Sequence, residues 1–236
     1  MPYAEFILVP MPSFDLSLLP PEPDLAFEMG LWEAGLSAVA GIDEAGRGAL
    51  AGPVAAGVVI LPPSNGISEL LKGVRDSKQL RPLQREVYRA IIVKHALCWG
   101  VGFTTAEEID QVGILPATRL AICRALESFA LQPEHLLLDY LFLPEITLPQ
   151  TALIKGDCRS LSIAAASILA KTARDTLLRE LDLTYPGYGF AAHKGYGTQA
   201  HREALLRLGP CPIHRLSFAL FGESRRPIGE EQPAME

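Results

Sequence analysis

The chain has 236 residues, of which 49% are hydrophobic and 20% are charged, so it can bury the core of one domain with an attached element. This composition excludes disordered and fibrous proteins. No stretch approaches the roughly 18 uninterrupted apolar residues of a membrane-spanning helix, and the first 20 residues lack the features of a secretory signal. We therefore expect a soluble, cytoplasmic protein with no membrane partner. We also expect it to be a monomer.

The four cysteines are far apart in the sequence and form no C-x-x-C pair. This spacing favours neither a disulfide framework nor a zinc site, so we interpret them as buried or incidental thiols. They are Cys98, Cys123, Cys158 and Cys211.

The net charge of -6 is concentrated at the two ends of the chain. Residues 1–36 hold six acids and no Lys or Arg, and residues 227–236 hold three acids and no base. The segment between them carries all 21 basic residues against 18 acids, and residues 155–226 alone have eleven bases and six acids. A mildly basic body can bind a polyanion on one face, although a solvated surface explains the same charges.

The N-terminal part predicts an appendage. Its first 23 residues contain six prolines and little periodicity, whereas Asp24 to Gly35 has the spacing of a short amphipathic helix with Asp24 as N-cap. We interpret residues 1–36 as an acidic extension of a body over residues 37–221. Residues 222–236 are predicted to form a flexible acidic tail.

The first half of the body predicts strands separated by helices. Apolar runs at 37–42 and 54–61, joined by a Gly-rich turn, are typical of a buried strand pair. A helix is expected over 83–96, since Pro82 suits a first helical turn, and a strand over 98–103.

The chain continues with a capping box at Thr105–Glu108 and a helical repeat of apolar residues over 116–131. Short apolar strands are expected at 135–139 and 151–154, the second of them leading into Lys155-Gly-Asp157.

The last part predicts mainly helices. The longest covers 160–183, and its alanine-rich start at 164–167 is expected to pack closely against the sheet. After a Gly- and Tyr-rich stretch at 184–197, helices are expected over 199–208 and near Ser217. This order predicts an α/β fold with a central mixed sheet flanked by helices and a C-terminal helical extension.

Four acids follow apolar strands. Asp43 and Glu44 are adjacent, and Asp139 and Asp157 each come at the exit of another strand. One edge of a mixed sheet could bring all four together, where they would repel one another unless a cation lay among them. Hard oxygen ligands select Mg²⁺ or Mn²⁺, so the pattern indicates a divalent-metal site. The alternative is that each acid is a turn or cap residue, which is weakest for the adjacent pair.

A turn containing Gly46, Arg47 and Gly48 follows the paired acids. Glycines would let the backbone approach a ligand closely while Arg47 reaches a phosphate, although a strained hairpin explains the same residues. The turn is not a dinucleotide fingerprint, and Lys171-Thr172 lacks the glycines of a P-loop.

Residues 41–54, GIDEAGRGALAGPV, resemble the opening motif of type 2 ribonuclease H, the ribonuclease HII family. Six more blocks resemble that family in its order, and together they cover about residues 37–221. They are 76–80 (DSKQL), 155–157 (KGD), 163–175 (IAAASILAKTARD), 188–190 (YGF), 193–198 (HKGYGT) and 214–218 (HRLSF).

The resemblance implies an RNase H-like fold and an endonuclease that cuts the phosphodiester 5′ of a ribonucleotide, in RNA/DNA hybrids or within duplex DNA. It leaves 3′-hydroxyl and 5′-phosphate ends and serves ribonucleotide and RNA primer removal in replication and repair. The family's metal-binding acids fall on Asp43, Glu44, Asp139 and Asp157. Two metals about 4 Å apart can activate water and stabilise the leaving 3′-oxygen, so no histidine nucleophile is needed.

The resemblance also implies substrate-binding residues. The junction-reading turn of the family falls on Gly46, Arg47 and Gly48, and its sugar-stacking tyrosine on Tyr196. Backbone groups of such a turn can bind the 2′-hydroxyl, the group that tells RNA from DNA.

Lysines and histidines of these blocks need separate interpretations. Lys78, Lys155 and Lys194 are candidates for phosphate contacts, against the alternative that each is a solvated lysine. His193, His201 and His214 lie outside the carboxylate group, so we favour structural or phosphate-facing roles for them over roles as catalytic bases.

Two positions depart from the family pattern. Asp139 is followed by Tyr140 where the family usually has glycine, and Ala49 stands where proline is frequent. Two rival functions stay open: a DNA nuclease or junction resolvase of the same fold, and a nucleic-acid-binding module without chemistry. The Gly-Arg-Gly turn argues against the first and the four acids against the second.

Overall fold

The computed structural model describes residues 15, 17, 19–64 and 66–221. The Pro-rich start up to residue 14 and the predicted tail at 222–236 lie outside the described residues. No helix within the described ranges is long and apolar enough to cross a membrane.

The strands form one five-stranded sheet with the order β3-β2-β1-β4-β5. β1 pairs antiparallel with β2, and β2 with β3, whereas β1–β4 and β4–β5 are parallel pairs. The mixed sheet expected from the sequence is therefore confirmed. The strands are β1 (Val39–Ala45), β2 (Val54–Ile60), β3 (Cys98–Thr104), β4 (His135–Asp139) and β5 (Gln150–Leu153).

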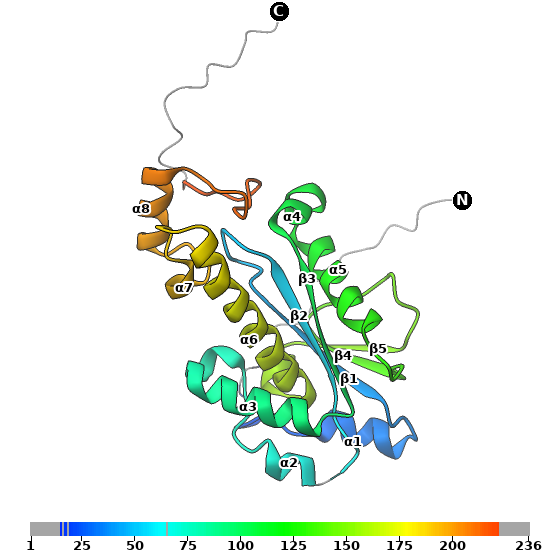
Figure 1. Ribbon diagram of the computed structural model, residues 1–236. Helices are drawn as coiled ribbons and strands as arrows, with labels where there is room; N and C mark the ends of the chain where they lie inside the picture. The colour runs from blue at the N-terminus through cyan, green and yellow to red at the C-terminus, as the bar shows by residue number, and fades with distance from the viewer. Residues whose placement is uncertain (1–14, 16, 18, 65, 222–236) are drawn as a thin grey trace, which may run out of the picture.

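Helices lie on both faces of this sheet and extend beyond one end of it (Figure 1). The α-helices are α1 (Ala26–Glu33), α2 (Gly66–Leu70), α3 (Pro82–His95), α4 (Ala106–Val112), α5 (Ile114–Glu127), α6 (Leu161–Thr184), α7 (Phe190–His193) and α8 (Gln199–Leu208). Two short 3-10 helices are η2 (Ser77–Gln79) and η3 (Gly156–Cys158).

Glycines in the strands let two helices approach the sheet from opposite sides. A Cβ atom at Gly41 or Gly57 would overlap the backbone of α6, and one at Gly102 would overlap the backbone of α5. The helix α6 therefore packs directly on β1 and β2 through its small residues, including Ala166, as the alanine-rich start predicted. Figure 1 shows α6 and α5 on the two sides of the strands.

Two apolar clusters fill the layers on the two faces of the sheet. On the α5 side, Ile42 and Val58 pack with Ile122, and on the α6 side Val59 packs with Leu169. Because side chains alternate along a strand, the near-continuous apolar runs of β1, β2 and β4 supply both cores. This explains why those segments read as buried strands in the sequence.

The structure corrects several expected elements. β1 continues to Ala45, so the paired acids lie inside the strand and not after it. α2, η2 and η3 were not expected, since each is too short to show a periodic apolar pattern. The segment around Ser217 forms turns and no helix, and Ser217 binds the carboxylate of Asp110 through its N–H and hydroxyl.

The helix α1 is shorter than expected and packs on the body. Its N-cap is Leu25, although the Asp24 carboxylate still accepts a hydrogen bond from the N–H of Ala26 at 2.9 Å. Phe27 and Leu31 lie against an apolar cluster that contains Leu137 of β4. The boundary after residue 36 stays a prediction, but this packing ties the extension to the sheet.

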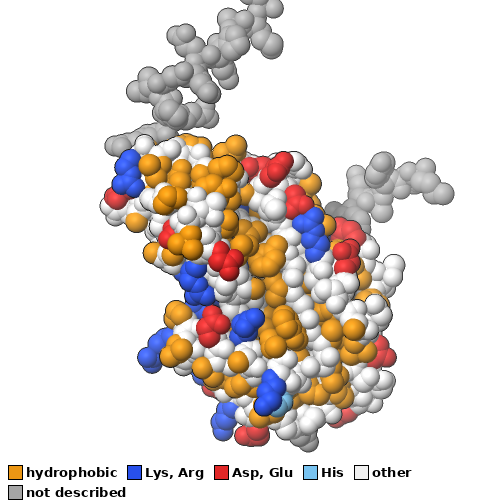
Figure 2. Space-filling view, in the orientation of Figure 1, with side chains coloured by type: hydrophobic (Ala, Val, Ile, Leu, Met, Phe, Trp, Pro, Cys, Tyr) orange, Lys and Arg blue, Asp and Glu red, His pale blue; other side chains and the backbone are white. Residues whose placement is uncertain are grey.

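The basic side chains of one face are unevenly spread. Figure 2 shows most of its Lys and Arg on the half where α3, α6 and α7 lie, with single acids among them and apolar side chains along the middle. Two of these basic side chains, Arg85 of α3 and Lys171 of α6, line a pocket at the end of β1. Part of the positive charge counted in the body therefore lies around this pocket.

Candidate active site

Three of the four predicted acids are brought together by neighbouring strands. The parallel register places Ile42 beside Leu138, so Asp43 and Asp139 come next on adjacent strands. Asp157 lies in η3, directly after β5, and the preceding Gly156 donates its N–H to Oδ1 of Asp139 at 2.7 Å. The three carboxylates therefore lie at one edge of the sheet, where the sequence suggested that all four acids could meet.

The electrostatics of these acids reflect their closeness. Burial raises the pKa of Asp43 well above its usual value, and the charges of Glu44, Asp139 and Asp157 raise it further. Burial and the neighbouring Asp157 raise the pKa of Asp139 to about 6, against the opposing effect of the Gly156 N–H. Such mutual repulsion is relieved when a cation enters the cluster.

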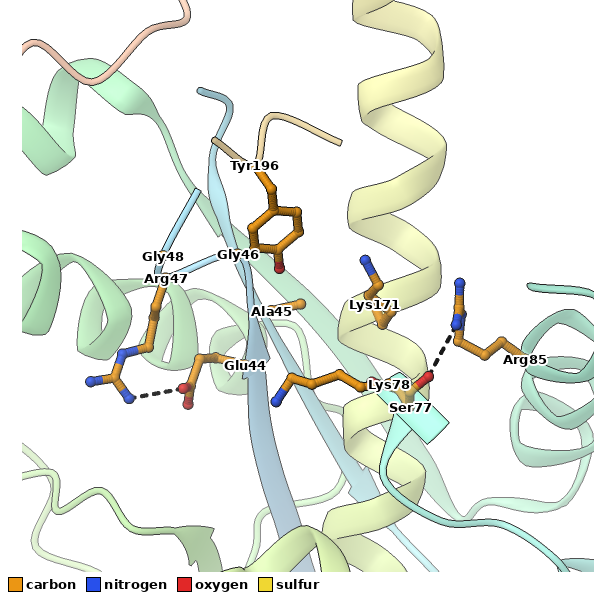
Figure 3. Close-up of a pocket in the computed structure, with 10 residues that line it drawn as sticks. All are labelled: Glu44, Ala45, Gly46, Arg47, Gly48, Ser77, Lys78, Arg85, Lys171 and Tyr196. Carbon is orange, nitrogen blue, oxygen red and sulfur yellow. Dashed lines mark hydrogen bonds and ion pairs between the residues drawn. The ribbon is translucent and has the colours of Figure 1, made fainter. Parts of the chain in front are cut away.

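Glu44 faces the other side of the strand. Since Asp43 shares the face of Gly41, which meets α6, the next residue points away from it. The Glu44 carboxylate instead pairs with Arg47 at 3.0 Å (Figure 3). Among the described residues, no three His, Cys, Asp or Glu side chains converge closely enough to hold a metal ion as they stand.

The donor set nevertheless fits a hard divalent cation. Oδ1 of Asp157 is buried and has no hydrogen-bond partner within the described part of the chain. A buried carboxylate oxygen without a partner is unfavourable, and a cation would satisfy it. The pKa of Asp157 is raised, mainly by burial and by Asp76, which is a further sign of unbalanced negative charge.

A pocket of about 430 Å³ opens beside these acids, at the end of β1. In Figure 3, Tyr196 points its hydroxyl down into this pocket and Lys78 extends toward β1, while the Glu44 carboxylate points away from Lys78 toward Arg47. The lining residues are Glu44, Ala45, Gly46, Arg47, Gly48, Ser77, Lys78, Arg85, Lys171 and Tyr196. The pocket thus brings together the predicted turn, tyrosine and one predicted lysine.

The three predicted lysines have different surroundings. Burial disfavours the charge of Lys78, but Asp76, Asp43 and other nearby groups outweigh this and raise its pKa. Lys155 adopts a left-handed backbone conformation before η3 and lies outside the pocket. The Lys194 ammonium donates to the carbonyl of Ala191, and burial lowers its pKa.

Several pocket residues were not singled out from the sequence. Lys171 of α6 donates to the Asp175 carboxylate at 2.7 Å, and Arg85 of α3 lies 3.4 Å from the same carboxylate. Arg85 also donates to the main-chain carbonyl of Ser77 at 3.0 Å (Figure 3). The helical spacing of Lys171 and Asp175 was visible, but the link to α3 depends on tertiary packing.

Two buried histidines, His201 and His214, lie next to the backbone of Tyr196. Nδ1 of His201 lies 3.0 Å from the carbonyl oxygen of Tyr196, and its Nε2 lies 3.0 Å from Nε2 of His214. Because a carbonyl only accepts, His201 carries its proton on Nδ1 and accepts from His214, whose Nδ1 accepts the N–H of Cys211 at 2.9 Å. Burial lowers the pKa of His201 to about 4, and burial also lowers the pKa of His214.

The third ring, His193, stacks on His201 with centroids 4.3 Å apart. None of the three histidines lines the pocket beside the acids, although His193 lines a neighbouring pocket that also contains Lys194 and Tyr196.

Two buried arginines that contact the turn were also not singled out from the sequence. Arg174 of α6 and Arg215 are both fully buried and donate to main-chain carbonyls around Gly46 and Gly52. They lie in segments that match the family's blocks, but no sequence pattern reveals main-chain partners. Gly46 itself has φ +95°, and a Cβ atom there would overlap the Arg174 guanidinium.

A family model described as Ribonuclease HII matches residues 40–221. The chain belongs to the ribonuclease HII family. A ribonuclease HII from Synechococcus sp. (strain JA-3-3Ab) is 56% identical over 198 residues, which cover 84% of this chain and 89% of that protein. A ribonuclease HII from Moorella thermoacetica is 51% identical over 193 residues, covering 82% of this chain and 92% of the relative.

A solved structure is similar to this chain in fold as well as in sequence. The crystal structure of the ribonuclease H2 from Pyrococcus horikoshii OT3 superposes with a TM-score of 0.65 at 29% identity, covering 78% of this chain and 94% of that one. The resemblance read from the motifs and the expected fold are therefore confirmed, and the chain is an endoribonuclease of the ribonuclease HII family.

Proposed function

We propose that this protein hydrolyses the phosphodiester on the 5′ side of ribonucleotides, in RNA/DNA hybrids and in duplex DNA with embedded ribonucleotides, leaving 3′-hydroxyl and 5′-phosphate ends. The observation that carries the proposal is the position of Glu44 and the Gly46–Gly48 turn in one pocket, beside the buried Asp43 and Asp157. Groups suited to phosphodiester chemistry thus lie next to groups suited to reading a 2′-hydroxyl.

The acids are proposed as the ligands of Mg²⁺ or Mn²⁺. Asp43, Asp139 and Asp157 would hold the cations at the sheet edge, and Glu44 would join them by leaving its contact with Arg47. When bound, two such ions supply an activated water and charge stabilisation for the leaving 3′-oxygen. The unpartnered Oδ1 of Asp157 and the raised pKa of Asp139 support this assignment.

The turn and Tyr196 are proposed to recognise the ribonucleotide. A Cβ atom at Gly48 would have no heavy atom within 4 Å, so the backbone is open to a ligand there. The Tyr196 ring lies over the pocket, with Lys171 Nζ and the Arg174 guanidinium carbon each 5.4 Å from its centroid. This packing would hold the ring against a deoxyribose and disfavour a 2′-hydroxyl at that position.

Basic residues around the pocket are proposed to hold the backbone of the nucleic acid. Lys78, Lys171 and Arg85 line it directly, and Lys194 lines a neighbouring pocket of about 290 Å³ that also contains Tyr196. Their charges would position phosphates without reading sequence. For Lys155, whose charge acts on Asp157, we keep the proposal of a phosphate contact near the acids.

We also expect this activity to remove ribonucleotides and RNA primers during DNA replication and repair, in the cytoplasm and as a monomer. The family membership supports this role.

The test is cleavage of three end-labelled duplexes of the same sequence: all DNA, DNA with one ribonucleotide, and an RNA/DNA hybrid. Each is incubated with Mg²⁺, Mn²⁺ or a chelator. We expect metal-dependent cuts 5′ of the ribonucleotide in the second duplex, at several positions in the hybrid, and nowhere in the first. Extension by a DNA polymerase and sealing by a ligase would identify the two new ends.

The rival functions give different outcomes in the same assay. A junction resolvase would cut a four-way DNA junction that contains no ribonucleotide, and a binding module would retain the duplexes without cutting them. Either outcome would contradict the proposal.

A further inference from the structure

Arg215 is a fully buried cation. None of the ion pairs among the described residues includes it, although the charge of Asp110 acts on it from nearby. Burial of a guanidinium without a paired carboxylate is strongly unfavourable, so its place in the fold needs a specific reason.

The guanidinium donates its hydrogen bonds to main-chain carbonyls of the turn at Gly46–Gly48 and of Gly52. Nη2 donates to the carbonyl oxygen of Gly46 at 2.8 Å, and Nη1 donates to that of Arg47 at 2.8 Å. Nε and Nη2 also bind the carbonyl of Gly52, at 3.0 and 2.9 Å. One planar fork thus binds both ends of the loop that follows β1, a geometry that a lysine ammonium does not reproduce.

These contacts set the direction of two amide groups. The described chain has no cis peptide bond, and in a trans peptide the C=O and the N–H point in opposite directions. Since the carbonyls of Gly46 and Arg47 point at Arg215, the N–H groups of Arg47 and Gly48 point away from it. Neither N–H donates to any acceptor within the described residues, whereas the next one, of Ala49, binds back to Gly46.

The direction away from Arg215 is the direction of the pocket. Gly46, Arg47 and Gly48 all line the pocket, and Arg215 does not. The two adjacent N–H groups can therefore converge on one acceptor oxygen, in the way that successive main-chain amides form anion-binding concavities. A cation bound to the carbonyl side of each peptide also polarises it, which strengthens its N–H as a donor.

Arg174 supports the same arrangement from α6. It donates to the carbonyls of Pro53 and Ala51 at 2.8 and 3.1 Å, and to that of Lys194 at 2.9 Å. It therefore links the exit of the loop to the segment that carries Tyr196.

We propose that Arg215 is a positioning residue for ribonucleotide recognition: by binding the carbonyls of Gly46 and Arg47, it presents the N–H groups of Arg47 and Gly48 to the 2′-hydroxyl oxygen of the substrate. The inference rests on the proposed function, because it concerns the site assigned there to reading the ribonucleotide. It predicts that Arg215 controls discrimination between ribonucleotide and deoxyribonucleotide, and not the general affinity for a duplex.

The test measures the dissociation constants of a duplex with one ribonucleotide and of the all-DNA duplex, in the non-cleaving Asp43→Asn background. We expect Arg215→Lys and Arg215→Met to reduce the ratio of the two constants at least tenfold, while the affinity for the DNA duplex changes less than twofold. Arg124→Lys is the matched control, since Arg124 also donates to a main-chain carbonyl, that of Phe103 at 2.8 Å, but lies outside the pocket. Its ratio should stay unchanged.

A second measurement keeps Arg215 unchanged, so it tests the inference even if the Arg215 variants do not fold. In the ¹⁵N-labelled Asp43→Asn protein, the amide signals of Arg47 and Gly48 should shift downfield with the ribonucleotide duplex and not with the DNA duplex. Equal responses to the two duplexes, or folded Arg215 variants with an unchanged ratio, would overturn the inference. If the Asp43→Asn protein itself does not discriminate, and the wild type cuts both duplexes, it is the proposed function that fails.

Discussion

The Oε1 atom of Glu28 accepts hydrogen bonds from the main-chain N–H of Ser162 at 2.9 Å and from the Ser162 hydroxyl at 2.5 Å. The Ser160 hydroxyl donates to the same oxygen at 2.6 Å. Ser160 is the N-cap of α6, so a carboxylate from α1 accepts a hydrogen bond from a first-turn N–H that has no partner within the longest helix. Glu28 is 1% exposed, and burial raises its pKa.

Loss of this contact should destabilise the whole body. We expect Glu28→Ala to lower the melting temperature by about 5–10 °C, because it removes three hydrogen bonds in a buried site and leaves the main-chain N–H of Ser162 without its acceptor. Glu28→Gln should melt close to the wild type, since its amide oxygen can still accept. Thermal melting of both variants checks this, and an alanine variant as stable as the glutamine variant would contradict it.

Deletion of residues 1–34 should have the same effect in a stronger form. It removes Glu28 and also uncovers the apolar cluster around Leu137 and Ile163, on which Phe27 and Leu31 pack. We expect a lower melting temperature but intact cleavage at a temperature where the truncated protein is folded. A well-folded truncated protein that does not cut would show that the extension belongs to the active enzyme.

The extension illustrates what the sequence could predict. The spacing of apolar residues is a local pattern and predicted the helix, but it gave no buried role to Glu28. The partner of Glu28 lies more than 130 residues further along the chain, and no local pattern links the two. Asp43 and Asp139, by contrast, could be singled out because each stands at the end of a short apolar run.

The glycine-rich turn shows the same limit. Its glycines and Arg47 could be singled out from the motif, but the support of Arg215 consists of bonds to main-chain carbonyls. Every residue has such a carbonyl, so sequence alone does not indicate which ones an arginine will bind.

Replacement of Asp43 should separate stability from activity. Asp43→Asn removes a charge whose burial is unfavourable, so we expect it to raise the melting temperature at about pH 7.5 in a chelator by a few degrees. The same change should abolish Mg²⁺-dependent cleavage, by at least about 10³-fold, because an amide is a poor substitute for a charged ligand. Mg²⁺ should stabilise the wild type and have little effect on the variant.

Glu107→Gln is the matched control for this prediction. It removes one negative charge on the exposed side of α4, and both melting and cleavage should stay as in the wild type. Activity of Asp43→Asn within a few-fold of the wild type would contradict its role as a ligand.

The stability of the metal-free protein should depend on Asp139. Its pKa is raised from 3.8 to about 6, so the folded state binds more protons than the unfolded chain between these values. The stabilisation is therefore complete below the ordinary pKa and is lost as the pH rises through about 6. We expect Asp139→Asn to flatten this dependence, with its largest gain over the wild type above about pH 6.5. Melting curves in a chelator over a pH series would check this, and parallel profiles would contradict it.

The two glycines of the turn should respond differently to substitution, because one is required by the fold and the other faces open space. Gly46 has φ +95° and contacts the Arg174 guanidinium, so Gly46→Ala should lower the melting temperature by about 5 °C or more.

Gly48 has no positive φ, and a Cβ atom there meets nothing within 4 Å. Gly48→Val should therefore fold like the wild type but place its side chain in the pocket beside the two free N–H groups. We expect at least about tenfold slower cleavage at a single ribonucleotide, which corresponds to a loss of about 1.4 kcal/mol, with unchanged affinity for the DNA duplex.

Arg47→Ala should instead weaken binding of both duplexes, since it removes a charge and keeps the backbone. A Gly48→Val enzyme that cuts normally would show that the 2′-hydroxyl is read elsewhere.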